Sequence, residues 1–416
     1  MIGSDRIDVW RRENVKTAVM YGAGNIGRGF IAELFAGSGY EVVFLDINDL
    51  LIDTLNKDRC YTITKVSNEE EQQVVIENIR AINTARDERS AILEIAHCDI
   101  MATAVGANIL RHIAPVIAKG LTMREAAGLG DLNILLCENL MDVDVFFRNL
   151  LKKELGEASA ELLAHVGLVE TSIGRMVPVM TGDHYPTDVT VEAFEILHAD
   201  KDGFVGAIPD IKKMVAYSPF EAYFRRKLYM HNMGHAVTAY LGAIKGYEYI
   251  YEAINDVEIR YCVHECGMES AAAIAADGFP LAQLVDFYER LIYRFGNERL
   301  RDTTFRVGRD TPRKLAHNDR ITGSINLCKK TGVPFAFMWI GVAAGLLFNP
   351  PEDSQSKKIS EDAARDLRGA ITKATGITSE ADMVAIGKLY NLLRNKDIRG
   401  AISYCTKLKS SMIIDS

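Results

Sequence analysis

The chain has 416 residues, 48% of them apolar and 25% charged, and its 56 acidic and 48 basic side chains give a formal net charge of −8. This composition is typical of a globular protein with two or three domains, and the acidic balance argues against a nucleic-acid-binding protein. The polar opening Met1–Asn14 has no apolar signal sequence, no apolar run reaches the length of a membrane span, and the seven cysteines are scattered. These features predict a cytosolic protein with free thiols.

The first part of the chain alternates between strand-like and helical patterns. Apolar runs ending in glycine or polar residues are typical of buried parallel strands, and the segments between them carry helical periodicity. The pattern predicts strands at 17–20, 40–45, 100–105 and 133–137, a helix through Phe30, Ile31, Leu34 and Phe35, a helix at 107–119, and β-like alternation at 187–197. Such alternation predicts an α/β fold of the Rossmann type, a doubly wound and mainly parallel sheet.

From about residue 210 onward helical periodicity dominates. The pattern predicts helices within 221–241, 253–276, 281–295 and 360–408, a buried helix around 335–347, and an exposed loop at 349–358. We therefore expect three parts: an N-terminal extension over 1–14, an NAD-binding Rossmann-type domain over 15–209, and a mainly helical substrate and catalytic domain over 210–416.

A glycine motif opens the first predicted helix. Gly22-Ala-Gly24-Asn25-Ile26-Gly27 follows a strand, and Asp46 ends the next strand. In this setting the first glycine permits a tight turn, the second lets the backbone approach a pyrophosphate, and the third lets the helix pack on the sheet. The helix N-terminus offers N–H groups to the phosphates. The alternative is a glycine-rich turn without a ligand.

Asp46 indicates which dinucleotide the motif binds. Its carboxylate can accept hydrogen bonds from both hydroxyls of the adenosine ribose and would repel a 2′-phosphate, so the sequence favours NAD over NADP. Thr103-Ala104-Val105 ends a later strand. We expect it beside the same crevice, because parallel sheets bind ligands at the carboxyl ends of their strands.

One group of cysteine and histidine residues resembles a metal site. Cys262 and Cys266 flank His264 and would share one face of a helix. A structural zinc needs four ligands, and the sequence has no second paired cluster to supply the others. We therefore predict a buried helix here and no metal.

The segment from Arg226 to Ala236 carries a set of proton-transfer groups. Lys227, His231, Asn232 and His235 fall within about 140° of one helix face. Oxidation of an alcohol without a metal needs a base and hydrogen-bond donors, and a buried lysine has a lowered pKa that suits it to act as that base. The alternative is a set of polar residues on an exposed helix.

The same segment resembles the catalytic signature of the polyol-specific long-chain dehydrogenase/reductase family, and most closely its mannitol-1-phosphate 5-dehydrogenase branch. The similar stretches extend over about residues 16–345 and include Gly22–Ile31, Thr103–Gly106, Ile113–Gly120, Cys137–Asn139, Arg225–Gly242, Arg306–Arg309 and Arg313–Leu315. The resemblance implies NAD-dependent, metal-independent interconversion of a polyol phosphate and a ketose phosphate, with mannitol 1-phosphate and fructose 6-phosphate as the expected pair. We expect a small-molecule substrate, no nucleic-acid or membrane partner, and a monomer or homodimer.

The resemblance also implies a role for each matching residue. Lys227 would be the general base, Asn232 and Asn139 would stabilise the oxygen that develops charge, and His235 would orient substrate hydroxyls. Arg306 and Lys314 match positions that contact substrate. Arg309 and Arg313 are further cations that could bind a phosphate. For these last two, a solvated basic loop is the alternative.

Two departures from the family pattern leave other functions open. Gly174 stands where the family has an aspartate, and Phe224, Arg225 and Arg226 replace an acidic residue before the lysine. One alternative is a dehydrogenase of an unphosphorylated polyol or a sugar acid, of the mannitol 2-dehydrogenase or hexuronate reductase type. Another is a dinucleotide-binding protein without strong catalysis.

Overall fold

The computed structural model describes residues 15–178 and 184–414, so the expected N-terminal extension Met1–Asn14 lies outside the described residues. The chain forms two compact units, Met1–Phe220 and Glu221–Ser416. The sequence pattern places residues 210–220 with the helical part. The structure instead puts a strand there, Met214–Tyr217, which pairs with a neighbouring strand of the first unit.

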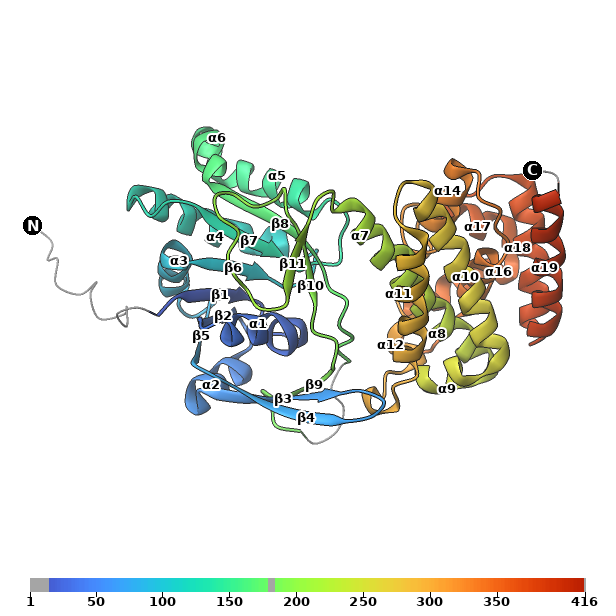
Figure 1. Cartoon of the computed structure of the whole chain (residues 1–416), viewed down its shortest axis with the longest axis horizontal. Coiled ribbons are helices and arrows are strands. Elements are labelled where there is room, and N and C mark those ends of the chain that lie inside the picture. The colour runs from blue at the N-terminus through green and yellow to red at the C-terminus, as the bar shows by residue number, and fades with distance from the viewer. Residues whose placement is uncertain (1–14, 179–183, 415–416) are drawn as a thin grey trace, which may run out of the picture. The chain divides into compact units, whose positions relative to one another are not determined.

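An eight-stranded sheet forms the centre of the first unit (Figure 1). Its order is β11-β10-β8-β7-β6-β1-β2-β5, and every pair is parallel except β8 with β10. The strands are β1 Thr17–Tyr21, β2 Glu41–Asp46, β5 Ile79–Asn83, β6 Ile100–Thr103, β7 Leu132–Leu136, β8 Val166–Ser172, β10 Leu197–Asp200 and β11 Met214–Tyr217. The predicted fold class, with its mainly parallel sheet, is confirmed.

Helices cover both faces of this sheet because its buried strands alternate their side chains between two apolar layers. Ala18 and Met20 of β1 pack with the first helix on one face, whereas Val19 and Tyr21 pack on the other. The first layer contains η1 Gly27–Ile31, a π-helical turn that continues as α1 Ala32–Gly37, together with α2 Asp49–Asp58. The second layer contains α3 Glu88–His97, α4 Leu110–Ala126 and α5 Val143–Leu155. Three short turns follow α5: η2 Gly156–Ala158, α6 Ser159–Leu162 and η3 Leu163–His165.

A second, three-stranded sheet was not predicted. It joins β3 Cys60–Val66 to β4 Glu71–Glu77 in an antiparallel pair and to β9 Val189–Glu192 in a parallel pair. This sheet packs against the first helix, since a Cβ on Gly29 would lie 2.7 Å from Val191. The predicted β segment over 187–197 thus belongs to two different sheets, through β9 and β10.

The named elements of the second unit are all helices within the described residues (Figure 1). Its elements are α7 Glu221–Arg226, the π-helical turn η4 Lys227–Asn232, α8 Met233–Lys245, α9 Ile250–Asn255, α10 Val257–Ala276, α11 Leu281–Phe295, η5 Glu298–Leu300, α12 Thr304–Gly308, α13 Thr311–Lys314, α14 Thr322–Thr331, α15 Met338–Leu347, α16 Ser354–Arg365, α17 Leu367–Thr375, α18 Glu380–Arg394 and α19 Ile398–Ile414. The predicted loop over 349–358 is wrong in its second half. Asp353 caps a helix there by accepting the N–H groups of Gln355 and Ser356, each at 3.1 Å.

Helix α15 is buried along almost its whole length, as the apolar run predicts. It has no side-chain cap of its own. Glu269 of α10 takes that role: its carboxylate accepts the N–H groups of Ala336, Phe337 and Met338 at 2.8, 3.1 and 3.1 Å. None of the described helices is both long and apolar enough to cross a membrane.

All seven cysteines lie in the described part of the chain and are free thiols. Cys262 and Cys266 are buried on α10, and burial raises the pKa of Cys262 to about 12. His264 between them bonds to Glu289, with Nε2 2.9 Å from a carboxylate oxygen. The two thiols therefore contribute to the helix core, which is the structural role that the sequence predicts.

Candidate active site

The glycine loop between β1 and η1 has the geometry that its sequence predicts. Gly22 has φ +103°, and a Cβ there would lie 2.6 Å from the carbonyl oxygen of Ala104. A Cβ on Gly27 would overlap the carbonyl oxygen of Gly22. A Cβ on Gly24, by contrast, would meet no described atom within 4 Å. Only the middle glycine therefore faces open space, where a pyrophosphate could approach the backbone.

Arg28 and Asn25 fix this loop from the helix side. The buried Arg28 donates from Nε to the carbonyl oxygen of Ala23 at 2.7 Å and from Nη1 to the carbonyl oxygen of Thr187. Asn25 donates to the carbonyl oxygen of Pro178 at 3.1 Å. The following residue, Ile26, packs against the apolar layer. The loop is thus held in shape without a ligand.

Asp46 lies directly beside the glycine loop. Its Oδ2 accepts the N–H of Ala23 at 2.7 Å, and its Oδ1 accepts the N–H groups of Ile47 and Asn48 at 2.7 and 3.0 Å. Three of about four acceptor positions on the carboxylate are therefore occupied. The remaining acceptor position, on Oδ2, can accept a hydrogen bond from one ribose hydroxyl. The structure therefore leaves room for one such bond, where two are expected from the sequence. The residues of this loop fit a dinucleotide with an unmodified ribose.

The Thr103–Gly106 segment lies against the glycine loop, because β6 is paired with β1. Ala104 donates its N–H to the carbonyl oxygen of Tyr21 at 2.9 Å. The buried Glu138, which follows β7, accepts the N–H groups of Val105 and Gly106 at 3.0 and 2.7 Å. Burial raises the pKa of Glu138, while these bonds oppose the shift. Glu138 is a positioning residue that the sequence analysis did not identify.

Lys227 begins a π-helical turn that sets the geometry of the candidate catalytic residues. In such a turn the backbone bonds run from i to i+5, as the N–H of Met233 shows by bonding to the carbonyl oxygen of Leu228. Lys227 and Asn232, five residues apart, therefore lie one above the other. An α-helix would separate them by about 140°. Short π-turns are frequently found at functional sites.

The surroundings of Lys227 favour its neutral form. Burial is the main cause and the positive charges of Arg320 and Arg313 add to it, so that the pKa of Lys227 falls to about 7, against the opposing charge of Asp319. The predicted lowering of this pKa is thus present in the structure. Asn232 is buried, and its Nδ2 has no hydrogen-bond partner among the described residues. An unpaired buried donor is costly unless a ligand satisfies it.

His235 lies on the first turn of α8, stacked on Phe295 with ring centroids 4.7 Å apart. Burial lowers the pKa of His235 to about 3, so its ring is neutral at physiological pH. Its Nε2 is 3.6 Å from a carboxylate oxygen of Asp302, which also forms a two-point ion pair with Arg306. Asp302 thus lies between the predicted hydroxyl-orienting histidine and a predicted substrate-contacting arginine, and of the two it bonds only to the arginine.

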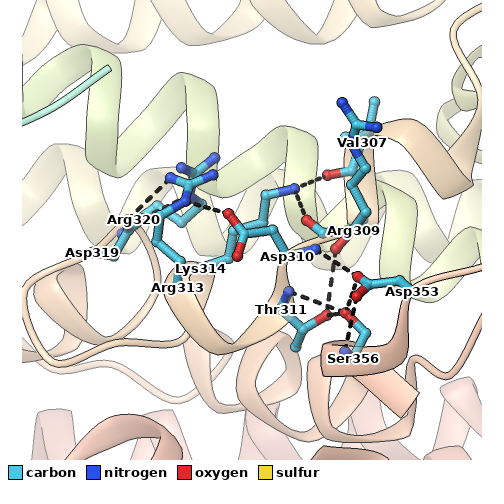
Figure 2. A network of polar contacts seen from close by, with 11 residues as sticks. Val307, Arg309, Asp310, Thr311, Arg313, Lys314, Asp319, Arg320, Asp353 and Ser356 are labelled. Carbon is cyan, nitrogen blue, oxygen red and sulfur yellow. Dashed lines mark hydrogen bonds and ion pairs between the residues drawn. The ribbon is translucent and has the colours of Figure 1, made fainter. Parts of the chain in front are cut away.

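The loop that precedes Lys314 holds the amine of this lysine in place (Figure 2). Its Nζ donates to the carbonyl oxygens of Val307 and Arg309, the latter at 2.5 Å. Burial and nearby arginines, Arg320 first, lower its pKa well below the usual value. The loop is anchored to α16, because Asp353 accepts the N–H of Asp310 at 2.7 Å.

The two additional cations of this loop differ in their surroundings. Arg313 is exposed and paired with Asp310, and its Nη1 lies 3.5 Å from Asp319. Arg309 is exposed, and no ion pair of its side chain is found in the described part of the chain. Their role as phosphate ligands stays a prediction.

Asn139 lies apart from this group in the chain. It is exposed in the segment just after β7 of the first unit, next to Glu138. The other predicted catalytic residues, Lys227, Asn232 and His235, all lie on η4 and α8 of the second unit. The pairing of Asn139 with Asn232 at the reacting oxygen stays a prediction.

At Gly174, where the family has an aspartate, the backbone packs against an aromatic ring. A Cβ on Gly174 would lie 3.0 Å from the ring of Phe194. The adjacent Arg175 is buried and bonds to Glu33 at 2.5 Å. Before the lysine, Arg225 pairs with Glu221 and Asp277. Both departures therefore have local structural partners.

Three further residues near Lys227 and His235 were not identified from the sequence: Asp302, Asp319 and Arg320. Each is a charged residue in a segment of weak periodicity, and only the fold places it beside the lysine helix. The adjacent Asp319-Arg320 pair is visible in the sequence but carries no spacing signal.

Comparisons with known proteins extend over nearly the whole chain. A family model described as the mannitol dehydrogenase Rossmann domain matches residues 16–213, and one described as the mannitol dehydrogenase C-terminal domain matches residues 219–405. A mannitol-1-phosphate 5-dehydrogenase of Thermoanaerobacter pseudethanolicus is 37% identical over 386 residues, which cover 91% of this chain and 98% of the relative.

Two solved structures have the same fold. The Pseudomonas fluorescens mannitol 2-dehydrogenase, in a ternary complex with NAD and D-mannitol, matches with a TM-score of 0.77 at 18% identity and covers 95% of each chain. A substrate-free D-sorbitol dehydrogenase matches with a TM-score of 0.76 at 15% identity, over 93% of this chain and 95% of the other.

Proposed function

This chain belongs to the mannitol dehydrogenase family of NAD-dependent polyol dehydrogenases, and on that premise we propose that it interconverts mannitol 1-phosphate and fructose 6-phosphate, with Lys227 as general base. The 37% identity to a mannitol-1-phosphate 5-dehydrogenase supports the phosphorylated substrate. The observation that carries the base assignment is the position of Lys227 on the π-turn, with a pKa of about 7 and Asn232 one turn away. We propose that the enzyme acts in the cytoplasm.

The chemistry divides between the two sets of residues. NAD, when bound, supplies the hydride acceptor. The neutral amine of Lys227 takes the hydroxyl proton as the carbon–oxygen double bond forms. The Nδ2 of Asn232 donates to the oxygen while it carries negative charge. Neutral His235, held against Phe295, can donate to or accept from a neighbouring hydroxyl and adds no competing charge.

The basic residues around Lys314 supply the site for an anionic group. Arg306 and Lys314 are oriented by Asp302 and by backbone carbonyls, respectively, so they are set in place before substrate arrives. Arg309 and Arg313 lie on the same loop and are accessible to solvent. We assign the phosphate to this loop because arginine is suited to bind its oxygens in pairs.

The test is a substrate panel with purified protein. NADH absorbance is followed with fructose 6-phosphate in one direction and mannitol 1-phosphate in the other, with D-mannitol, D-fructose and hexuronates as unphosphorylated arms, and NADP as the second cofactor. We expect turnover with the phosphorylated pair and NAD. Activity confined to an unphosphorylated arm would reassign the substrate. NAD binding without turnover on any arm would mean a dinucleotide-binding protein without strong catalysis.

The phosphate site is tested by neutralising its two exposed cations together. Arg309→Gln with Arg313→Gln should raise the KM for the phosphorylated substrate at least tenfold, because charge-assisted contacts are lost. The kcat should change little. An unchanged KM would show that the phosphate binds elsewhere.

The base assignment predicts both a rate and a pH profile. Lys227→Ala should lower kcat for oxidation by about 10²–10⁴, the usual contribution of a general base, with NAD affinity retained because Gly24 and Asp46 are untouched. In the wild type, oxidation should fall about tenfold per pH unit below pH 7, because protonated lysine accepts no proton. Lys330→Ala, an exposed lysine of α14, is the control. Near-normal activity of Lys227→Ala with an unchanged profile would assign the base to His231 or His235.

A further inference from the structure

Arg320 is a buried cation that the turn before α14 holds in place (Figure 2). Only 6% of it is exposed. Asp319 accepts both its backbone N–H, at 2.6 Å, and its side-chain Nε, at 2.7 Å, through the same oxygen Oδ1. Its Nη2 has no hydrogen-bond partner within the ranges that the structure describes. The guanidinium is therefore fixed at one end and unpaired at the other.

Direct packing places this turn against the turn that carries Lys227. A Cβ on Gly323 would lie 2.8 Å from the ring of Tyr229, so only a glycine allows the close approach. The hydroxyl of Ser270 donates to the carbonyl oxygen of Tyr229 at 2.7 Å and also bonds to the hydroxyl of Ser324. Gly323 and Ser324, which follow Arg320 at the start of α14, thus hold this turn close to η4.

The largest charge effects on Lys227 come from this turn and from α13. Arg320 and Arg313 lower its pKa, in that order after burial, and Asp319 raises it. On η4 itself His231 is neutral, since burial, with Arg294 next, lowers its pKa well below the usual value. Burial lowers the pKa of both His235 and Lys314, and the charge of Arg320 adds to each shift.

We propose that Arg320 is a positioning residue of this site: Asp319 holds its guanidinium in the turn packed against the Lys227 turn, and its fixed positive charge acts on the lysine amine that accepts the hydroxyl proton. This role rests on the proposed function of Lys227 as base. It gives a reason for burying a cation, with its Nη2 unpaired, beside the Lys227 turn. Arg320 acts through Lys227 and need not touch the substrate.

Two neighbouring substitutions should move the pH profile of oxidation in opposite directions. Arg320→Gln removes the positive charge. The acidic limb of the kcat/KM profile, whose midpoint reports the pKa of Lys227, should therefore move to higher pH by roughly one pH unit or more. Asp319→Asn keeps an oxygen in place of Oδ1 but removes the negative charge, so the limb should move down. Arg320→Lys keeps the charge and should leave the limb near its wild-type position.

The controls distinguish the effect of the Arg320 charge from a loss of folding and from the effect of removing a distant surface charge. Lys330→Gln on α14 removes the same charge from an exposed position, where solvent screens it, and should not move the limb. NAD affinity and far-ultraviolet circular dichroism of each variant show whether the fold is retained. Opposite shifts for Arg320→Gln and Asp319→Asn support the proposal. If the acidic limb of Arg320→Gln stays at its wild-type pH while Lys227→Ala is inactive, the proposal for Arg320 is overturned. The assignment of Lys227 as the base then still holds.

A second measurement does not depend on turnover. Trace labelling of the folded protein with acetic anhydride, followed across pH by peptide mass spectrometry, reports the neutral fraction of Lys227 directly. The midpoint should be higher in Arg320→Gln than in the wild type. Equal midpoints overturn the proposal, even if Lys227→Ala retains activity and the base itself has to be reassigned.

Discussion

Gly24 and Gly27 stand three residues apart in the same motif, yet the same substitution should damage them in different ways. A methyl group on Gly27 would overlap the carbonyl oxygen of Gly22 and lie 3.2 Å from its carbonyl carbon, so the backbone itself must shift. Overpacking against side chains usually costs about 1–3 kcal/mol, and a rigid backbone partner places Gly27→Ala at the upper end or beyond. For a unit of this size, about 3 kcal/mol corresponds to a Tm roughly 6–12 °C lower.

Gly24→Ala should leave stability intact and weaken the cofactor instead. The new methyl group meets no described atom within 4 Å, and loss of chain entropy in the unfolded state should stabilise the protein by about 0.4–1 kcal/mol. The methyl would occupy the space that a pyrophosphate needs. Loss of one or two charge-assisted hydrogen bonds, at about 1.5–3 kcal/mol each, raises the Kd for NAD by roughly tenfold to several hundredfold or more.

The assay pairs thermal unfolding without cofactor with calorimetric titration of NAD. Gly37→Ala is the matched control, since this exposed glycine ends the same helix and also faces open space. Its Tm and Kd should both stay near those of the wild type. The reasoning fails if Gly24→Ala binds NAD normally, because the pyrophosphate then does not approach that backbone. It fails equally if Gly27→Ala keeps its Tm.

Three other substitutions test single contacts of the two sites. Asp46→Ala should weaken NAD binding and narrow the discrimination against NADP, measured by titration with both, because it removes a ribose acceptor and a charge that repels a 2′-phosphate; an unchanged preference would mean that the ribose is recognised elsewhere. Glu138→Ala leaves the N–H groups of Val105 and Gly106 without their acceptor, at about 1–3 kcal/mol, so Tm should fall by several degrees and the Kd for NAD should rise; wild-type values for both would refute its positioning role. Asp302→Asn should raise the KM for the polyol severalfold at constant NAD affinity, since Arg306 loses its ion-pair partner; a KM equal to that of the wild type would show that Arg306 needs no such support.

The sequence was most informative where structure depends on neighbours along the chain. The strand, glycine loop and helix around Gly22–Gly27 follow from local periodicity and from the φ that only glycine adopts readily. The β3-β4-β9 sheet could not be predicted, because β9 lies more than a hundred residues from β3 and pairs with it only in the fold. The predicted boundary at residue 210 missed β11, whose four residues are too few to give a clear strand pattern and are defined as a strand by pairing with β10.

The candidate catalytic residues show the same division. Lys227, Asn232 and His235 could be found from their spacing and from the family resemblance, but the sequence pattern gave an ordinary helix where the chain makes a π-turn. A change from i+4 to i+5 bonding leaves no mark in hydrophobic periodicity. Arg320 and Glu138 could not be assigned because the groups beside them are distant in sequence: the Lys227 turn for Arg320 and the Val105 N–H group for Glu138.

The capping of α15 by Glu269 has a consequence for how the helical unit folds. An apolar segment with no cap of its own has little tendency to form a helix in isolation, and its exposed surface would promote aggregation. Because the carboxylate that satisfies its first N–H groups comes from α10, made some sixty residues earlier, the segment gains order only by docking onto a helix that already exists. Partial opening of α15 would expose Glu269 and three backbone donors at once, which makes this part of the unit cooperative rather than separately mobile.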